Sequence, residues 1–286
     1  MPGMEAQPRE YRVDAGALRL SVRDHAGEGP PVVCLHGLAS NARWWDLVAP
    51  RLAPRRVVAV DQRGHGLSDK PDGGYDFDTV VADARGVVAS LGLGPVAVAG
   101  HSWGASVALA WAAADPDGVR AVVCVDGGVG DLRRYFGDSW AVAEKAMRPP
   151  DLVGVEAPAL RGWVSRSGLA GDGDPAAAEE ILRGNFETMR DGRLRPRLRV
   201  ERHMRIAYEL YHLDSTSLLS GVTQPVQLLL AERDGSDARH AAAEAAVRSL
   251  PRGSELRWIE GIHDLPVQRP GEVAGAMVEF LSGQGS

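Results

Sequence analysis

The chain reads Val-Ala-Val-Ala-Gly-His-Ser-Trp-Gly-Ala over residues 96–105. Residues 96–99 form an apolar run typical of a buried strand, and the alanine-rich run 105–114 predicts a helix. Between them, a Gly-x-Ser-x-Gly pattern centres on Ser102, and the two glycines permit a sharp turn from strand to helix. A serine at such a turn is exposed at the end of its strand, so we expect Ser102 to be a nucleophile.

A second serine has a similar neighbourhood but lacks the strand. Residues 137–141 read Gly-Asp-Ser-Trp-Ala, with Ser139 in the centre, and they follow the run Arg-Arg-Tyr-Phe at 133–136. This run does not predict a buried strand. We therefore reject Ser139 as a nucleophile.

Short apolar runs alternate with helical patterns along most of the chain. An expected hairpin is followed by further predicted strands, and together these segments are 10–13, 18–23, 32–35, 57–60, 96–99, 119–125, 226–230 and 256–259. The helical patterns are 44–52, 79–91, 105–114, 237–250 and 270–281. This alternation predicts an α/β fold whose mostly parallel sheet is covered by helices on both faces.

The alternation stops between residues 127 and 222, where no strand-like run is found. Helical stretches at 140–147, 176–190 and 198–211 are separated by proline and glycine. Because strands resume at residue 226, we interpret this part as an insertion. We predict a core domain formed by residues 1–128 and 223–286, and a helical cap at 129–222.

Two backbone amides are candidates for stabilising negative charge beside Ser102. The sequence His36-Gly37-Leu38 ends an earlier strand, and its glycine lets the backbone pass close to the nucleophile. We expect the N–H groups of Leu38 and Trp103 to form an oxyanion hole.

These features resemble the α/β-hydrolase superfamily, and in particular its branch of esterases and relatives with a helical cap. The resemblance also includes Asp-Gln-Arg-Gly-His-Gly-Leu-Ser at 61–68, which matches the family's D-x-R-G-x-G-x-S segment. It covers nearly the whole chain except the cap. It implies the α/β-hydrolase fold, with a mostly parallel eight-stranded sheet flanked by helices and the cap inserted after strand six.

The resemblance also implies where the base and the acid stand. His263 follows the last predicted strand, and Asp234 follows the strand after the cap, which gives the order Ser102, Asp234, His263. We prefer Asp234 as the acid, although an aspartate in that place can instead cap the next helix. Asp126, at the end of the strand before the cap, is the alternative acid.

Several residues are candidates for a substrate pocket between core and cap: His36, Gly37, Trp44, Trp140 and Trp163. The tryptophans indicate an apolar pocket, and packing of the cap onto the core is their alternative role. His65 and His101 are expected to shape loops rather than to transfer protons.

Composition limits the partners and the compartment. The net charge of −6 gives no basic field for nucleic acid, and residues 1–14 lack an apolar signal core. Cys34 and Cys124 cannot build a disulfide framework. The strand order that the resemblance implies places the strand of Ser102 between theirs, so we expect them not to form a disulfide. We expect a cytoplasmic monomer or homodimer that acts on a small molecule, with no nucleic-acid, membrane or metal partner.

The resemblance implies hydrolysis of carboxylic esters of small, largely apolar substrates through an acyl-enzyme, without a cofactor. Lactone opening, carbon–carbon bond hydrolysis and perhydrolysis use the same triad and stay open. Serine at position 102 argues against haloalkane dehalogenases and epoxide hydrolases, which need a carboxylate nucleophile. The alternative from another class is a receptor-like relative that binds its ligand without turnover.

Overall fold

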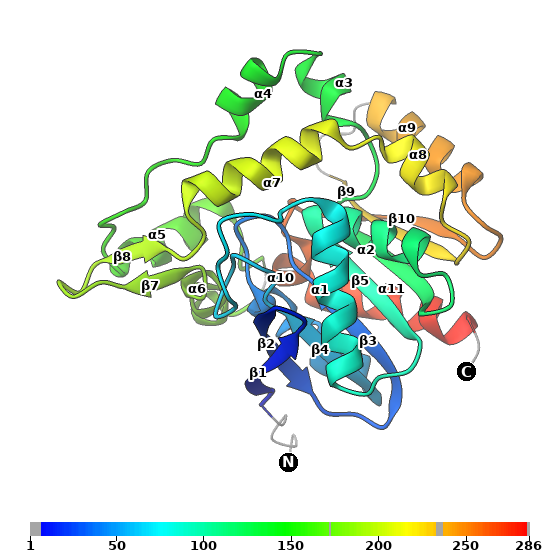
Figure 1. Ribbon diagram of the computed structural model, residues 1–286, viewed down its shortest axis with the longest axis horizontal. Helices are drawn as coiled ribbons and strands as arrows, with labels where there is room; N and C mark the ends of the chain where they lie inside the picture. The colour runs from blue at the N-terminus through cyan, green and yellow to red at the C-terminus, as the bar shows by residue number, and fades with distance from the viewer. Residues whose placement is uncertain (1–6, 172, 233–236, 285–286) are drawn as a thin grey trace.

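The computed structural model describes residues 7–171, 173–232 and 237–284. One eight-stranded sheet forms its centre (Figure 1), in the order β1-β2-β4-β3-β5-β6-β9-β10. The strands are β1 (Arg9–Ala15), β2 (Leu18–His25), β3 (Gly29–Leu35), β4 (Arg55–Val60), β5 (Val96–His101), β6 (Val119–Val125), β9 (Val226–Glu232) and β10 (Glu255–Glu260). β2 pairs antiparallel with β1 and β4, and all other pairs are parallel. The predicted α/β fold is confirmed.

Helices cover both faces of the sheet because successive side chains of each strand point to opposite sides. On β3, Val33 packs into a cluster with α1 (Phe77–Ser90), α2 (Trp103–Ala114) and α9 (Asp237–Ser249). Its neighbour Cys34 belongs to a second cluster, which contains side chains of α10 (Leu265–Gln268) and α11 (Pro270–Gly283). The two apolar clusters together form the core.

The chain between β6 and β9 contributes no described strand to the main sheet. We call residues 129–222 the insertion; its helices are α3 (Leu132–Phe136), α4 (Trp140–Met147), α5 (Pro158–Ser167), α6 (Pro175–Arg183), α7 (Val200–His212) and α8 (Ser215–Ser220). Figure 1 shows α7 between α4 and the sheet, with α5 and α6 farther out on one side. The expected insertion after the sixth strand is thus observed.

Two details differ from the sequence prediction. The insertion contains a hairpin, β7 (Phe186–Thr188) and β8 (Leu194–Pro196), whose three-residue strands are too short to show an alternating pattern. The helix expected at 44–52 consists of two short 3₁₀ helices, η1 (Ala42–Trp45) and η2 (Ala49–Leu52). Pro50 lies in the second, and proline cannot donate the backbone hydrogen bond that a continuous α-helix would require there.

The two cysteines lie on β3 and β6, on either side of β5. In the register of the sheet Cys34 is paired with Ala99, and Cys124 with Gly100. Both thiols are free and buried, and burial raises their pKa. The expectation that they do not form a disulfide is confirmed. Among the described helices, none has the length and apolarity needed to cross a bilayer.

Candidate active site

Ser102 lies at the junction of β5 and α2, with backbone angles φ 54° and ψ −119°. A non-glycine residue adopts such a conformation only when its surroundings hold it there. The turn is so tight that a Cβ atom on Gly100 would lie 2.1 Å from the carbonyl oxygen of Gly104. The strand–turn–helix arrangement predicted around Ser102 is therefore present.

A chain of hydrogen bonds connects Ser102 with a histidine and a carboxylate. The Oγ atom of Ser102 lies 2.9 Å from Nε2 of His263, and Nδ1 of the same ring lies 2.5 Å from Oδ2 of Asp126. Asp126 directly follows β6, and its backbone is also left-handed, with φ 44°. The three residues have the mutual geometry of a nucleophile, a base and an orienting acid.

The carboxylate that is hydrogen-bonded to His263 is thus that of Asp126, which was only the alternative acid in our prediction. Asp234, which we preferred, lies outside the described residues, and its role stays a prediction. Asp126 is well placed because β6 is the direct neighbour of β5: Val125 pairs with His101, and the amide of Ser102 donates to the carbonyl of Val125 at 2.9 Å. The ends of two adjacent parallel strands therefore bring the acid and the nucleophile side by side.

Electrostatics adapt both members of the acid–base pair to their roles. Burial disfavours the charged form of His263, but the hydrogen bond and the charge of Asp126 outweigh this effect and raise the pKa of the imidazole. Burial also opposes ionisation of Asp126, yet its hydrogen bonds to His263 and to the amide of Ala231 lower the pKa of the carboxyl group. Asp126 is thus held as a carboxylate next to a strengthened base.

Two backbone N–H groups near Ser102 have no acceptor among the described residues. Among the described residues, neither Leu38 N–H nor Trp103 N–H donates a hydrogen bond to another group of the protein. Gly37 brings the loop of Leu38 against the nucleophile, since a Cβ atom on Gly37 would lie 3.1 Å from Cβ of Ser102. Trp103 follows Ser102 and begins α2, where amides point outward without helical partners.

His65 contacts both segments that carry these amides. Its Nδ1–H donates to the carbonyl of Arg63 at 2.9 Å, so Nε2 can accept the N–H of Ala39 at 3.3 Å. Its ring stacks on Trp103 with centroids 5.4 Å apart. Burial lowers the pKa of His65 well below its usual value, so the ring is neutral and holds the loop after Leu38.

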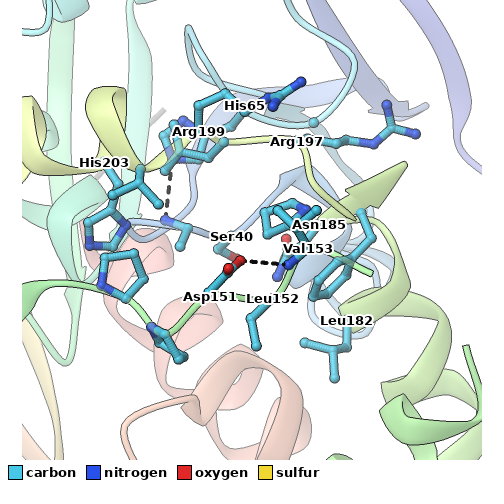
Figure 2. A pocket seen from close by; sticks show the side chains of 18 of the residues that line it. Ser40, His65, Asp151, Leu152, Val153, Leu182, Asn185, Arg197, Arg199 and His203 are labelled. Carbon is cyan, nitrogen blue, oxygen red and sulfur yellow. Dashed lines mark hydrogen bonds between the residues drawn. The ribbon is translucent and has the colours of Figure 1, made fainter. Parts of the chain in front are cut away.

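A cavity of about 370 Å³ lies between this loop and the insertion (Figure 2). Ala39, Ser40 and His65 line it from the core. Its lining from the insertion is largely apolar and consists of Pro149, Pro150, Asp151, Leu152, Val153, Trp163, Leu182, Asn185, Phe186, Pro196, Arg197, Leu198, Arg199, Val200, Glu201 and His203, with Gly66 completing it from the core. In Figure 2, Arg197 and Arg199 lie on one side of the cavity and Leu152 and Leu182 on the other.

Of the five residues expected in the pocket, Trp163 lines this cavity and the other four do not. His36 is buried, and its ring bonds to the carbonyl of Gly37 and the amide of Gln62, so its role is to hold the loop. Trp44 packs in the second of the two core clusters, the one that contains Cys34. Trp140 lies against Tyr208 and Tyr211, with ring centroids 5.2 and 5.4 Å away. Aromatic character alone could not distinguish packing from cavity lining.

Sequence reasoning missed Arg197 and Arg239. Arg197 lines the cavity, and its buried Nε atom has no hydrogen-bond partner among the described residues. Arg239 donates to Asp126 at 2.5 Å. In a chain with many arginines, neither position carried a motif that would have singled it out. Within the described ranges, no group of three His, Cys, Asp or Glu residues could hold a metal ion.

Comparison with known proteins agrees with this fold. A model of the alpha/beta hydrolase fold matches residues 30–153. The 2-(acetamidomethylene)succinate hydrolase of Mesorhizobium japonicum is 43% identical over 116 residues, which are 40% of this chain and 41% of that protein. A soluble epoxide hydrolase of a Corynebacterium species is 42% identical over 102 residues, 35% of this chain and 36% of its own. The aligned stretches thus span less than half of these relatives.

Solved structures extend the likeness over the whole chain. A crystal structure of E-2-(acetamidomethylene)succinate hydrolase superposes with a TM-score of 0.81 at 27% identity, covering 96% of this chain and 99% of that one. Residues 30–153 thus match the α/β-hydrolase family, and the chain as a whole has the α/β-hydrolase fold. The two matched relatives are named as hydrolases of different substrates.

Proposed function

We propose that the protein is a serine hydrolase that cleaves carboxylic esters through an acyl-enzyme. The observation that carries this proposal is the chain of hydrogen bonds from Ser102 through His263 to Asp126 at the end of the sheet. A serine hydroxyl is a weak nucleophile at neutral pH, and an adjacent oriented imidazole activates it.

The geometry supports a two-step reaction. His263 Nε2 accepts the proton of Ser102 as Oγ attacks the ester carbonyl, and the carboxylate of Asp126 stabilises the imidazolium. The amides of Leu38 and Trp103 are the proposed donors to the oxyanion. His263 then gives the proton to the leaving alcohol, and it activates the water that hydrolyses the acyl-enzyme.

The nucleophile distinguishes this chain from the epoxide hydrolases among its relatives. Epoxide opening through an alkyl-enzyme requires a carboxylate at the elbow, and this chain has Ser102 there. The cavity of about 370 Å³ is not lined by Ser102 or His263 but begins beside them, at Ala39 and at His65, whose ring stacks on Trp103. Its many apolar side chains suit a small acyl group attached to Ser102. We propose that the insertion acts as a cap over the site and determines which acyl groups the protein accepts.

A carboxylate-bearing acyl group is a second candidate substrate. One observation favours it: Arg197 lines the cavity, and its Nε atom is buried without a partner among the described residues. A buried donor left without an acceptor is costly, and a substrate carboxylate would satisfy it. The matched relative's name likewise contains a succinate.

Labelling with a fluorophosphonate and turnover of nitrophenyl esters test the proposal. Wild-type protein should react with the probe and release nitrophenol, and Ser102→Ala should lose both, with turnover reduced about 10⁶-fold. Ser139→Ala, at the rejected serine, should behave like wild type. A folded Ser102→Ala protein that still hydrolyses esters would contradict the mechanism, and a wild type that binds esters without labelling would indicate the receptor alternative.

Esters with neutral and carboxylate-ended acyl chains of equal length distinguish the two substrate classes. If Arg197 receives a carboxylate, Arg197→Met should raise KM for the anionic ester at least about 10-fold and leave the neutral ester unchanged. Equal changes for both esters would reject the second candidate and leave the first intact.

A further inference from the structure

We propose that Arg239 is a positioning residue for the catalytic pair: it fixes the carboxylate of Asp126 from behind and limits the protonation of His263 near neutral pH. The inference rests on the proposed function, because it concerns the same Ser102–His263 chemistry.

Arg239 is held in place from three directions. Its Nη2 group donates to Oδ1 of Asp126 at 2.5 Å, and its Nη1 group donates to the backbone carbonyl of Ala231. Its guanidinium carbon lies 5.3 Å from the ring centroid of Trp258, within the range of a cation–π contact. The arginine near the start of α9 therefore contacts the ends of β6 and β9 and a ring on β10.

The two oxygen atoms of Asp126 have different partners. Oδ2 faces Nδ1 of His263, whereas Oδ1 accepts from Arg239 and, at 2.9 Å, from the amide of Ala231. If the guanidinium is removed, Oδ1 loses one of these two donors and keeps the Ala231 amide. The main loss is then a positive charge behind a side chain that is only 7% exposed.

Charged and titratable groups from several elements face His263. Asp126 after β6 and Asp264 next to the base favour the protonated imidazole, whereas burial and the charge of Arg239 on α9 oppose it. His101 at the end of β5 also faces the ring, but burial lowers its pKa to about 4, so it is uncharged near neutral pH. A base that keeps its proton cannot accept one from Ser102. Arg239 thus offsets part of the attraction between Asp126 and the imidazolium, and this keeps His263 usable as a base.

The test compares Arg239→Met and Arg239→Lys with Arg248→Met. Arg248 lies on the same helix, is 68% exposed and pairs only with Glu244 in the described structure, which makes it a matched control. In Arg239→Met, the acidic limb of the kcat/KM profile on a neutral ester should move up by roughly 0.5 to 1 pH unit. Arg239→Lys should largely restore the wild-type limb, and Arg248→Met should not change it.

An NMR titration of the His263 ring gives the same answer without turnover. The midpoint should rise in Arg239→Met in parallel with the kinetic limb. A shifted midpoint in a protein without esterase activity would support the role of Arg239 and reject the proposed function, so the two failures are distinguishable.

A purely structural role predicts a different pattern. Activity would then fall by the same factor at every pH, together with a lower Tm, and the His263 midpoint would not move; this result would overturn the proposal. If Arg239→Met does not fold, Arg239→Gln keeps one donor but removes the charge, and an unshifted titration in that variant would overturn it equally.

Discussion

The Nε2–H group of His101 donates a 2.9 Å hydrogen bond to the backbone carbonyl of His263. His101 is the last residue of β5 and directly precedes Ser102. The same turn that exposes the nucleophile therefore also anchors the loop that carries the base. The two imidazole rings lie 4.9 Å apart, so the position of His263 depends on the end of β5.

His101→Phe should reduce turnover by about 10- to 100-fold, because a ring without a donor releases the loop of His263 and misplaces the base. Labelling of Ser102 by a small fluorophosphonate should slow by a similar factor. His212→Phe is the matched control, since His212 Nδ1 also bonds a backbone carbonyl, that of Tyr208, at 2.8 Å in the insertion, and His212 does not line the cavity. Equal effects of the two variants on labelling would show that the His101 bond has no special role.

Asp126→Asn should lower turnover by about 10⁴-fold, because an amide favours the wrong tautomer of His263 and cannot stabilise the imidazolium. Asp234→Asn should cost less than about 10-fold if Asp126 alone serves as the acid. Both variants need a folding check by circular dichroism. The reverse outcome would make Asp234 the acid, as we first preferred, and would leave the reaction class unchanged.

The free energy of unfolding should fall as the pH is lowered from about 6.5 toward 5. Burial lowers the pKa of His36 and His65, and it lowers that of His101 to about 4, so the unfolded chain binds more protons in this range. His101 alone contributes up to about 1.4 kcal/mol per pH unit between these limits. The raised pKa of His263 acts at higher pH: its stabilising effect grows as the pH falls toward about 6.5 and is nearly complete below that value, so it changes the slope in this range little.

Urea unfolding at several pH values measures this slope. In His101→Phe, the free energy of unfolding should depend less steeply on pH, because one of the buried neutral histidines is then missing. Unfolding free energies that stay constant or rise on acidification would show that these histidines are not neutral in the folded protein.

Trp163→Ala should change the ratio of rates for short and bulky acyl esters several-fold, because Trp163 lines the cavity. Trp140→Ala should lower Tm with little change in that ratio, because Trp140 packs against Tyr208 and Tyr211 within the insertion. Rates on a series of esters, compared with labelling by a small probe, check both expectations. Proportional effects in Trp163→Ala would reduce it to a packing residue.

The parts of the site that depend on neighbouring residues in the chain were predictable. The elbow at Ser102 requires only a strand, two glycines and a helix in succession, and all of them are local signals. The role of Asp126 as the acid was harder to predict, because it depends on β6 being the neighbour of β5 in the sheet. No local sequence pattern indicates the order of the strands. Trp44 and Trp163 could not be distinguished in the sequence. Only the folded chain shows that Trp44 is buried in a core cluster and that Trp163 lines the cavity.

The insertion leaves the sheet after β6 and returns to β9, which is the strand next to it. The amide of Asp126 donates to the carbonyl of Leu229 at 2.8 Å, so the pairing of β6 with β9 holds the two ends of the insertion together. Because closure entropy grows slowly with loop length, about 0.6 kcal/mol per doubling, a longer, shorter or foreign segment can be spliced in there. Such a chimera must keep Gly127, where a Cβ atom would lie 2.3 Å from the carbonyl oxygen of Ser102. The insertion can thus be replaced by a segment from another protein to change substrate selectivity, while Ser102, Asp126 and His263 keep their positions.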